Sequence, residues 1–372
     1  MKSSIVRSVA VAAACAAGLS ASLTTLPAVA APADAAAKPA VTNFGYKASV
    51  FGTKVRVNNV ELRTLRDANL QMPCTRKVGV SEAQPSIASV PLAIGNDLIK
   101  VAASTSESKT YRDAAKGING VRAVNTVADI KLGGTVAGIA TPVLKIEGLQ
   151  SIADSFFDAK ANGGKGAFRE EHSFKFKGMS LELPEESPIP QEVQQLLDIL
   201  NQVTAPIAQI VNQVITLLQT ITGPLEIPGL GSISLGSASG KTGKNFASSE
   251  AYALKVLVDA TGEETVLQLG RASSRISRPV TAGVFRSTMS ALELSALGDL
   301  VSLGGISQSS IPCEGTAGKT RTINTASASL IHDQLGVTLS GIKYAFSGLQ
   351  KGMTGKGFTS ATIGNVRLNV PN

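Results

Sequence analysis

Histidine and paired acidic side chains are the residues of this sequence that could do chemistry, and they are few. The chain of 372 residues holds two histidines, His172 and His332. Glu170 and His172 are two positions apart, so on a β-strand they share one face. A zinc site needs more ligands than this pair offers, and a catalytic triad is recognised by geometry rather than spacing. We therefore interpret Glu170 and His172 as exposed edge residues of a strand.

Two glycine-rich stretches, 236–242 and 315–320, imitate a phosphate-binding loop. Each lacks the first glycine of that motif, because Leu235 and Cys313 stand in its place. Neither stretch has the buried strand before it and the helix after it that the motif requires. We interpret both as glycine-rich turns.

Adjacent acidic residues occur at Glu185 and Glu186 and again at Glu263 and Glu264, each pair beside a proline or glycine. We interpret them as solvated turn residues rather than as a pair for general acid and base work. The sequence also has no G-x-S-x-G nucleophile elbow. We therefore predict no catalytic residue, no cofactor-binding residue and no metal ligand, in a protein that is not an enzyme.

The N-terminus has the pattern of a secretory signal peptide, residues 1–30. Lys2 and Arg7 precede an apolar, Ala-rich core at 9–19, and Ala28-Val29-Ala30 supplies a cleavage site. The core is too short for a membrane anchor, and no later apolar run is long enough, so we expect no integral membrane span. Residues 31–42 are rich in Ala and Pro, which predicts a disordered linker.

Cleavage after Ala30 would leave two cysteines, Cys74 and Cys313. An oxidising compartment permits a disulfide between them. Whether they pair depends on their distance in the fold, which the sequence does not supply.

The charge of the chain argues against a nucleic-acid partner. Removing Lys2 and Arg7 with the leader lowers the net charge from +8 to +6. The basic residues are scattered among acidic ones and Trp is absent, whereas nucleic-acid binding favours a concentrated basic patch. Weak attraction to an anionic cell envelope is compatible with this charge.

The elements that must position any site are mostly strands, with one helical insert at 190–222. Within it, apolar residues recur in a heptad pattern over four heptads. This face consists of Val193, Leu196, Leu200, Val203, Ile207, Ile210, Val214, Leu217 and Ile221. Pro206 either kinks one helix or starts a second. The face could cover the sheet, pair with a second copy of the chain, or dock to lipid or another hydrophobic partner, and all three interpretations stay open.

Period-two patterns predict an all-β fold, a sandwich or sheet-rich roll with an inserted amphipathic helix or kinked helix pair. The expected strands are 46–51, 54–57, 121–132, 172–183 with a reset at Gly178, 225–235, 250–258, 264–270, 338–346 and 361–370. We divide the chain into a β-domain at 43–277 and a partial second β-repeat at 278–372. The repeat rests on three blocks, 50–53, 72–74 and 86–92, which return as 284–287, 311–313 and 324–330.

These blocks resemble a family of exported actinobacterial repeat proteins, the choice-of-anchor P type. The resemblance is carried by Tyr46 with 50–53, by Cys74 with 86–90, by 227–231 (I-P-G-L-G) and by 253–256. It covers most of 43–275 and recurs in part at 284–345. The chain departs from the family in lacking a C-terminal sorting signal and in having Lys255 where histidine is common. The resemblance implies a surface-associated β-protein of unknown biochemical role and transfers no catalytic residue.

The sequence therefore predicts a secreted protein, extracellular or associated with the cell surface, that acts as a structural or binding protein. Its expected partner is a cell-envelope component, or a second copy of the chain bound through the helical insert. Two alternatives stay open: an extracellular hydrolase with a cryptic site, and a carrier of a hydrophobic ligand that uses the insert as a lid.

Overall fold

The protein is described by a computed structural model in which residues 39–372 form one compact unit. The structure describes residues 40–57, 60–62, 68–85, 90–91, 99–136, 139–140, 142–175, 177–182, 191–200, 209, 213–214, 225–227, 231–235, 238–258, 265–289, 294–296, 301–303, 309–332, 335–352 and 354–369. The predicted signal peptide at 1–30 lies outside these residues. The predicted linker at 31–42 is too long at its C-terminal end, because the first strand already begins at Val41.

Most of the described chain is antiparallel β-sheet, which confirms the predicted all-β fold. Sheet A has eight strands in the order β14-β15-β17-β18-β1-β2, with β16 also on β17 and β3 also on β1. Its strands are β1 (Val41–Val57), β2 (Val60–Leu62), β3 (Leu70–Lys77), β14 (Leu225–Ile227), β15 (Gly231–Leu235), β16 (Ala238–Gly243), β17 (Phe246–Val258) and β18 (Thr265–Ser277).

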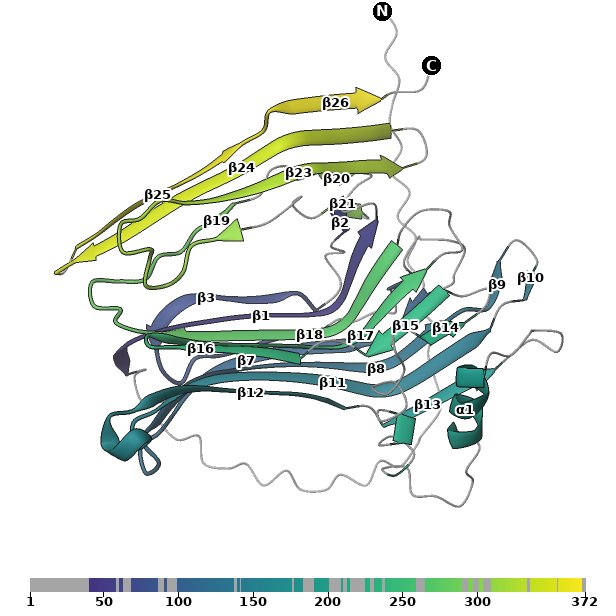
Figure 1. Cartoon of the computed structure of the whole chain (residues 1–372), viewed down its shortest axis with the longest axis horizontal. Coiled ribbons are helices and arrows are strands. Elements are labelled where there is room, and N and C mark those ends of the chain that lie inside the picture. The colour runs from purple at the N-terminus through teal and green to yellow at the C-terminus, as the bar shows by residue number, and fades with distance from the viewer. Residues whose placement is uncertain are drawn as a thin grey trace, which may run out of the picture. The chain divides into compact units, whose positions relative to one another are not determined.

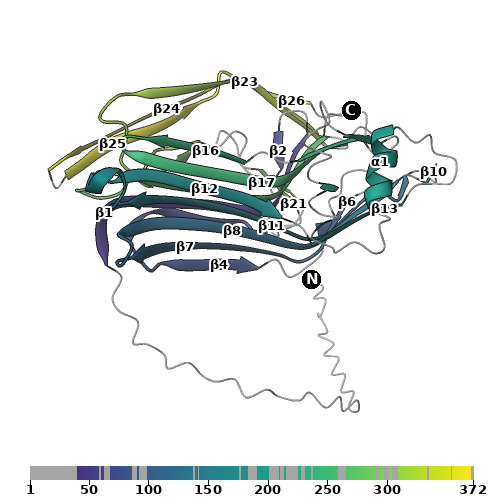
Figure 2. The ribbon, with the colours of Figure 1, turned by 60° about the horizontal axis from the view of Figure 1, so that its bottom comes forward.

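Sheet B also has eight strands, in the order β12-β11-β8-β6-β5, with β13 on β11, β7 on β8 and β4 on β7. Its strands are β4 (Ser81–Pro85), β5 (Val90–Pro91), β6 (Ile99–Val101), β7 (Ser104–Asp113), β8 (Ile118–Leu132), β11 (Val143–Asp158), β12 (Ala167–Lys175) and β13 (Gly178–Glu182). A short hairpin of β9 (Thr135–Val136) and β10 (Ile139–Ala140) and a 3-10 turn, η1 (Asn162–Gly164), join its strands. Figure 2 shows β4, β7, β8, β11 and β12 side by side.

Sheets A and B pack face to face as a β-sandwich, with β1 and β18 stacked over β8 and β11 (Figure 1). The core between them includes a cluster of twelve buried side chains: Tyr46, Ala48, Val50, Met72, Val121, Ala123, Ala153, Phe157, Phe168, Ala247, Ala272 and Ile276. At one end Arg278 closes the core, with its guanidinium carbon 4.0 Å from the centre of the Phe157 ring. Burial of these apolar faces supplies the main stabilisation of the sandwich.

Each sheet of the sandwich bends where a glycine takes a positive φ. In sheet B this is Gly148 (φ 58°), and in sheet A it is Gly270 (φ 66°). The inward-facing set on β11 changes phase at the bend, from Ile146 before it to Leu149 after it. The edge strands change at the same level, because β13 pairs with the part of β11 before Gly148 and β12 with the part after it. A Cβ on Gly270 would lie 2.4 Å from Leu149 Cδ2, so the two sheets also meet closely there.

The helix α1 (Gln191–Leu200) stands between the outermost strands of the two sheets. It contacts β13 of sheet B and β14 of sheet A, and Figure 2 shows it beside β13. Val193 and Leu196, on its apolar face, are 0% and 1% exposed. Pro206 and most of the second half of the predicted insert lie outside the described residues.

The C-terminal sheet is a four-stranded sheet made of β23 (Arg321–His332), β24 (Leu335–Lys351), β25 (Thr354–Thr362) and β26 (Asn365–Asn369). Short pairs precede it: β19 (Thr288–Met289) with β22 (Ser309–Ser310), and β20 (Leu294–Ala296) with β21 (Val301–Leu303). The ring of Phe285 packs on the C-terminal sheet at positions occupied by glycines. A Cβ on Gly348 would lie 3.1 Å from this ring, and a Cβ on Gly355 would lie 3.6 Å from it.

The C-terminal sheet repeats the pairing order of β8, β11, β12 and β13. In both sets two long strands pair with each other, β8 with β11 and β23 with β24. Two shorter strands follow and pair with the second long strand. The first of them, β12 or β25, pairs with its C-terminal half, and the second, β13 or β26, with its N-terminal half. Gly341 (φ 64°) bends β24 where β26 gives way to β25, as Gly148 bends β11. This topology matches β23 with β8, whereas the sequence matched 324–330 with 86–92. The duplication itself stays a prediction.

Several strand boundaries differ from those predicted. The stretch 225–235 forms a hairpin, β14 and β15, rather than one strand. The stretch 361–370 is interrupted at Gly364, between β25 and β26. Residues 238–243, predicted as part of a turn, form the edge strand β16, because every residue of that strand pairs with β17.

Candidate functional site

Cys74 and Cys313, the two cysteines that follow the predicted signal peptide, form a disulfide. Cys74 lies within β3, between Met72 and Thr75, which both pair with β1, and Cys313 lies between β22 and β23. Their sulfurs are 2.03 Å apart and their Cα atoms 5.5 Å apart. Both residues are buried, at 3% and 0% exposure. The bond fastens the segment that leads into the C-terminal sheet to sheet A.

Hydrogen bonds of Glu314 reinforce this junction. The carboxylate accepts a hydrogen bond from Arg275 Nη2 at 2.7 Å and another from Ser277 Oγ at 2.6 Å. The next residues, 315–320, form the predicted glycine-rich turn, in which Gly315 and Gly318 have positive φ. The turn packs on β24, because Thr316 Oγ1 accepts a hydrogen bond from the backbone N–H of Gly348 at 3.0 Å. This glycine-rich turn therefore makes its hydrogen bonds within the fold.

Glu170 and His172 lie on β12, where that strand faces sheet A. The strand β12 is an edge strand of sheet B, as predicted, but the two side chains are only 19% and 30% exposed, so they are partly buried rather than exposed. His172 Nδ1 is 2.8 Å from Glu170 Oε2. Glu170 also packs against the backbone of Gly240 on β16, which half buries it. The side chain of His332 and both acidic pairs lie outside the described residues.

The apolar face of the helical insert is buried in the part that the structure describes. Val193, Leu196 and Val214 are 0%, 1% and 0% exposed. This agrees with the interpretation that the insert covers the sandwich. The side chains of the other six residues of the face lie outside the described residues: Leu200, Val203, Ile207, Ile210, Leu217 and Ile221. The prediction of an interaction face therefore stays open for them.

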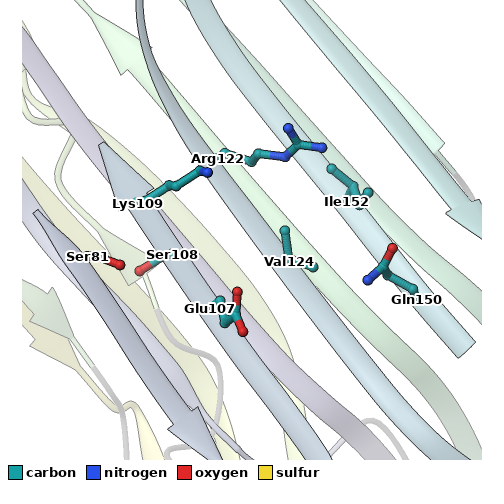
Figure 3. Close-up of a pocket in the computed structure, with 8 residues that line it drawn as sticks. All are labelled: Ser81, Glu107, Ser108, Lys109, Arg122, Val124, Gln150 and Ile152. Carbon is teal, nitrogen blue, oxygen red and sulfur yellow. The ribbon is translucent and has the colours of Figure 1, made fainter. Parts of the chain in front are cut away.

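A hollow of about 290 Å³ opens on the outer face of sheet B. We call it the sheet B groove. Its lining comes from four neighbouring strands, β4, β7, β8 and β11: Ser81, Glu107, Ser108, Lys109, Arg122, Val124, Gln150 and Ile152 (Figure 3). Because side chains alternate along a strand, Lys109, Arg122 and Gln150 point outward while Ser108 and Ala123 face the core.

The register places like charges side by side in the groove. Lys109 on β7 lies directly opposite Arg122 on β8. In the next rung, Val124 lies opposite Ile152 and gives the groove an apolar floor. Figure 3 shows both cationic side chains reaching over the sheet surface beside Val124 and Ile152. Like charges in directly opposite positions destabilise a sheet, so this pair is a place where a bound anion would stabilise the structure.

Acidic residues continue the same rung on the far side of Arg122. Asp154 on β11 is opposite Arg122, and Glu171 on β12 is opposite Asp154. Asp154 is only 8% exposed, and it accepts a hydrogen bond from Tyr111 Oη at 2.8 Å. Burial raises the pKa of Asp154, against the lowering effects of the Tyr111 hydrogen bond and of Arg122. Asp154 is thus engaged in a buried hydrogen bond with Tyr111, and the positive charges of Arg122 and Lys109 both act on its carboxyl group.

A glycine on the neighbouring strand leaves room for the ring of Tyr111. A Cβ on Gly120, directly opposite on β8, would lie 2.3 Å from the Tyr111 ring, so the ring covers the position of the missing side chain. Burial raises the pKa of the Tyr111 hydroxyl, and the neighbouring Asp154 raises it further. The hydroxyl therefore stays protonated and donates to Asp154.

The sheet B groove combines groups that bind different parts of one small molecule. Lys109 and Arg122 can bind an anionic group, and an Arg guanidinium suits a carboxylate or phosphate. Gln150 and Ser81 can exchange hydrogen bonds with hydroxyls, and Glu107 can accept them. Its volume is at the small end of the range for ligand pockets.

Sequence reasoning missed this groove because it missed three of its four strands. None of β4, β7 and β11 was predicted, and Ser81, Lys109 and Gln150 lie on them. The signal available was the alternation in 104–110, where Ser or Thr occupies every second position. Arg122 lay in a predicted strand, but nothing in the sequence gave its neighbour on β7.

Comparisons with known proteins give no relative. No family model matches the chain, and no curated protein and no solved structure matches it either. The resemblance to choice-of-anchor P proteins therefore stays a prediction. Within the described ranges, no helix has the length and apolar character needed to cross a membrane. Among the same residues, no three His, Cys, Asp or Glu side chains are grouped to hold a metal ion.

Proposed function

We propose that this protein is an exported, non-enzymatic binding protein of the cell envelope, and that its sheet B groove holds a small hydroxylated anion such as an acidic sugar. The observation that carries the proposal is the cross-strand pair Lys109 and Arg122 beside the apolar pair Val124 and Ile152. A sugar acid offers a carboxylate to the cations, hydroxyls to Gln150 and Glu107, and a C–H face to the floor.

The leader and the disulfide support export. The N-terminal pattern, with Lys2, Arg7 and the Ala28-Val29-Ala30 site, is that of a secreted protein. A buried disulfide between cysteines 239 residues apart suits an oxidising compartment, because cytosolic thiols are kept reduced.

Export is tested on the protein secreted by its native host. Mass spectrometry of the protein recovered outside the cell should give an N-terminus at Ala31. Recovery of the chain only from the cytosol, with Met1 or Lys2 at its N-terminus, would contradict the proposal.

Binding to the envelope is tested with purified envelope glycans on beads. The wild-type protein should be retained, and the groove variant Lys109→Gln/Arg122→Gln should be retained about tenfold less, which corresponds to 1.4 kcal/mol. The matched control is Lys165→Gln/Lys241→Gln, which removes two exposed cations outside the groove. Equal retention of all three proteins would contradict a role for the groove.

A hydrolase stays the second candidate because Glu170 and His172 are in contact. A histidine beside a carboxylate is the arrangement of a general base. If the protein hydrolyses envelope glycans, His172→Gln should abolish that activity. Unchanged activity in this variant would show that the contact between Glu170 and His172 is not responsible for the hydrolysis.

A further inference from the structure

The C-terminal sheet carries positive charge with almost no acidic residue to balance it. Residues 321–372 of the sequence contain five basic residues and one acidic residue, Asp333, a net charge of +4. Asp333 lies between β23 and β24, outside the described residues. The described residues of the four strands contain no acidic side chain. The positive charge of this sheet therefore comes from its lack of acidic residues rather than from an excess of basic ones.

The register places four of the five cations on one face. Ile342, Tyr344 and Phe346 of β24 are buried and define the inner face, so Lys343 and Lys351 point to the outer face. Lys356 lies opposite Leu349, which puts it on the outer face as well. The buried positions of β24 change phase at Gly341, because Leu339 is buried before the bend, so the position of Thr338, opposite Arg367, also belongs to the outer face. All four side chains are exposed.

The outer face is polar between its cations. Side chains with hydroxyl or amide groups occupy the intervening positions: Thr322, Asn324, Thr354, Ser360, Thr362 and Asn365. Two large apolar side chains stand beside Lys356, Leu349 at 44% exposure and Phe358 at 49%. Hydroxyls, amides and cations together are the groups that contact phosphate oxygens in proteins.

The fold does not require this charge. When β11 and β24 are matched at their bending glycines, Gly148 and Gly341, the position of Lys351 corresponds to Asp158. The corresponding face of sheet B mixes acids with bases, whereas the C-terminal sheet keeps only bases. The two sheets share their strand pairing, so the basic face is a property of this sequence rather than of the topology.

We propose that the outer face of the C-terminal sheet docks a linear phosphodiester polymer of the cell envelope. The cations follow the length of β24: Arg367 lies at the level of Thr338, and Lys351 is thirteen residues further along. At the rise of an extended strand this is about 40 Å, a span that suits a chain rather than one small anion. A membrane surface suits it less, because interfacial binding needs a large buried apolar area.

The test is binding of the full chain to inorganic polyphosphate, with orthophosphate as the monomer. Polyphosphate that can span about 40 Å should bind, and binding should weaken steeply as salt is raised. The variant Lys343→Gln/Lys351→Gln/Lys356→Gln/Arg367→Gln should lose about tenfold or more in affinity. Orthophosphate at the same total phosphate should bind weakly to every variant.

A charge-matched control separates this face from net charge. Lys165→Gln/Lys241→Gln/Lys244→Gln/Lys255→Gln removes four exposed cations of the sandwich and should change affinity less than about threefold. Equal losses in both variants, or no binding by the wild type, would overturn the proposal. So would binding to vesicles of anionic phospholipid without binding to polyphosphate. The groove variant Lys109→Gln/Arg122→Gln should keep polyphosphate binding, so this inference and the proposed function can fail separately.

Discussion

Cys74 and Cys313 are joined by a buried disulfide whose Cα atoms are 5.5 Å apart, although 239 residues separate them in the chain. A cross-link over so long a loop removes much of the freedom of the unfolded chain. It also holds the segment before the C-terminal sheet on the end of β1, where Cys313 packs against Gly45.

The disulfide should be complete in the protein made under oxidising conditions and should stabilise it. Thiol titration of the unfolded, non-reduced protein that begins at Ala31 should find no free thiol. Reduction should lower the free energy of unfolding by about 2–5 kcal/mol, measured by denaturant titration with and without a reductant. Two free thiols per chain would contradict the pairing.

Gly45 should not tolerate a side chain. A Cβ there would lie 2.6 Å from Cys313 Cβ and 3.0 Å from Val280 Cγ2. Gly45→Ala should therefore lower the free energy of unfolding by about 1–3 kcal/mol, because the core beside the disulfide is overpacked. Gly178→Ala is the control, since its Cβ would be 3.4 Å from the nearest atom, on Glu147. Equal melting temperatures for the two variants would argue against this close contact.

Asp154 should make stability depend on pH. Its folded-state pKa is raised above the ordinary value of 3.8, chiefly by burial. The folded state therefore binds this proton more tightly than the unfolded state. That contribution is complete below the ordinary pKa and is lost as the pH rises through the raised pKa.

Asp154→Asn stays neutral at every pH and keeps an acceptor for Tyr111 Oη. Its free energy of unfolding, minus that of the wild type, should rise with pH across this window and then level off. Denaturant titrations at several pH values measure the difference. Asp129→Asn, at an exposed position of β8, is the control, and a pH-independent difference for Asp154→Asn would contradict the account.

Leu196 should act as a core residue rather than as an interface residue. It is 1% exposed on a helix that contacts both sheets. Leu196→Ala should lower the free energy of unfolding by about 2–5 kcal/mol, while Gln195→Ala, on the exposed side, should change it by less than about 0.5 kcal/mol. If light scattering instead showed a wild-type dimer that Leu196→Ala converts to a stable monomer, self-association through the insert would be favoured.

The sequence was sufficient where side chains follow a simple apolar pattern. Val193 and Leu196 marked the helix, and the alternation around Val121 and Ala123 marked β8. The two cysteines made a disulfide possible, but the sequence left their pairing open, and the structure supplies it. The all-β class followed from the same alternation.

The sequence was insufficient where the core is lined with small polar residues. Ser104, Ser106 and Ser108 face the interior of the sandwich, so β7 shows no alternation of apolar and polar residues. On β11 the bend at Gly148 changes the phase of the inward-facing residues, which breaks the period of two. These two strands contribute half of the four strands that line the sheet B groove. The pairing of Lys109 with Arg122 depends on a register that no local pattern specifies.

Calorimetric titration of D-glucuronate into the mature protein tests the central claim most directly. D-Glucose, which lacks the anionic group, is the control ligand, and Lys165→Gln/Lys241→Gln is the control protein. We predict that D-glucuronate binds the wild type and the control protein equally, and Lys109→Gln/Arg122→Gln at least about tenfold more weakly. Absence of D-glucuronate binding to the wild type, or equal affinity for D-glucose, would contradict the claim that the groove holds a small hydroxylated anion.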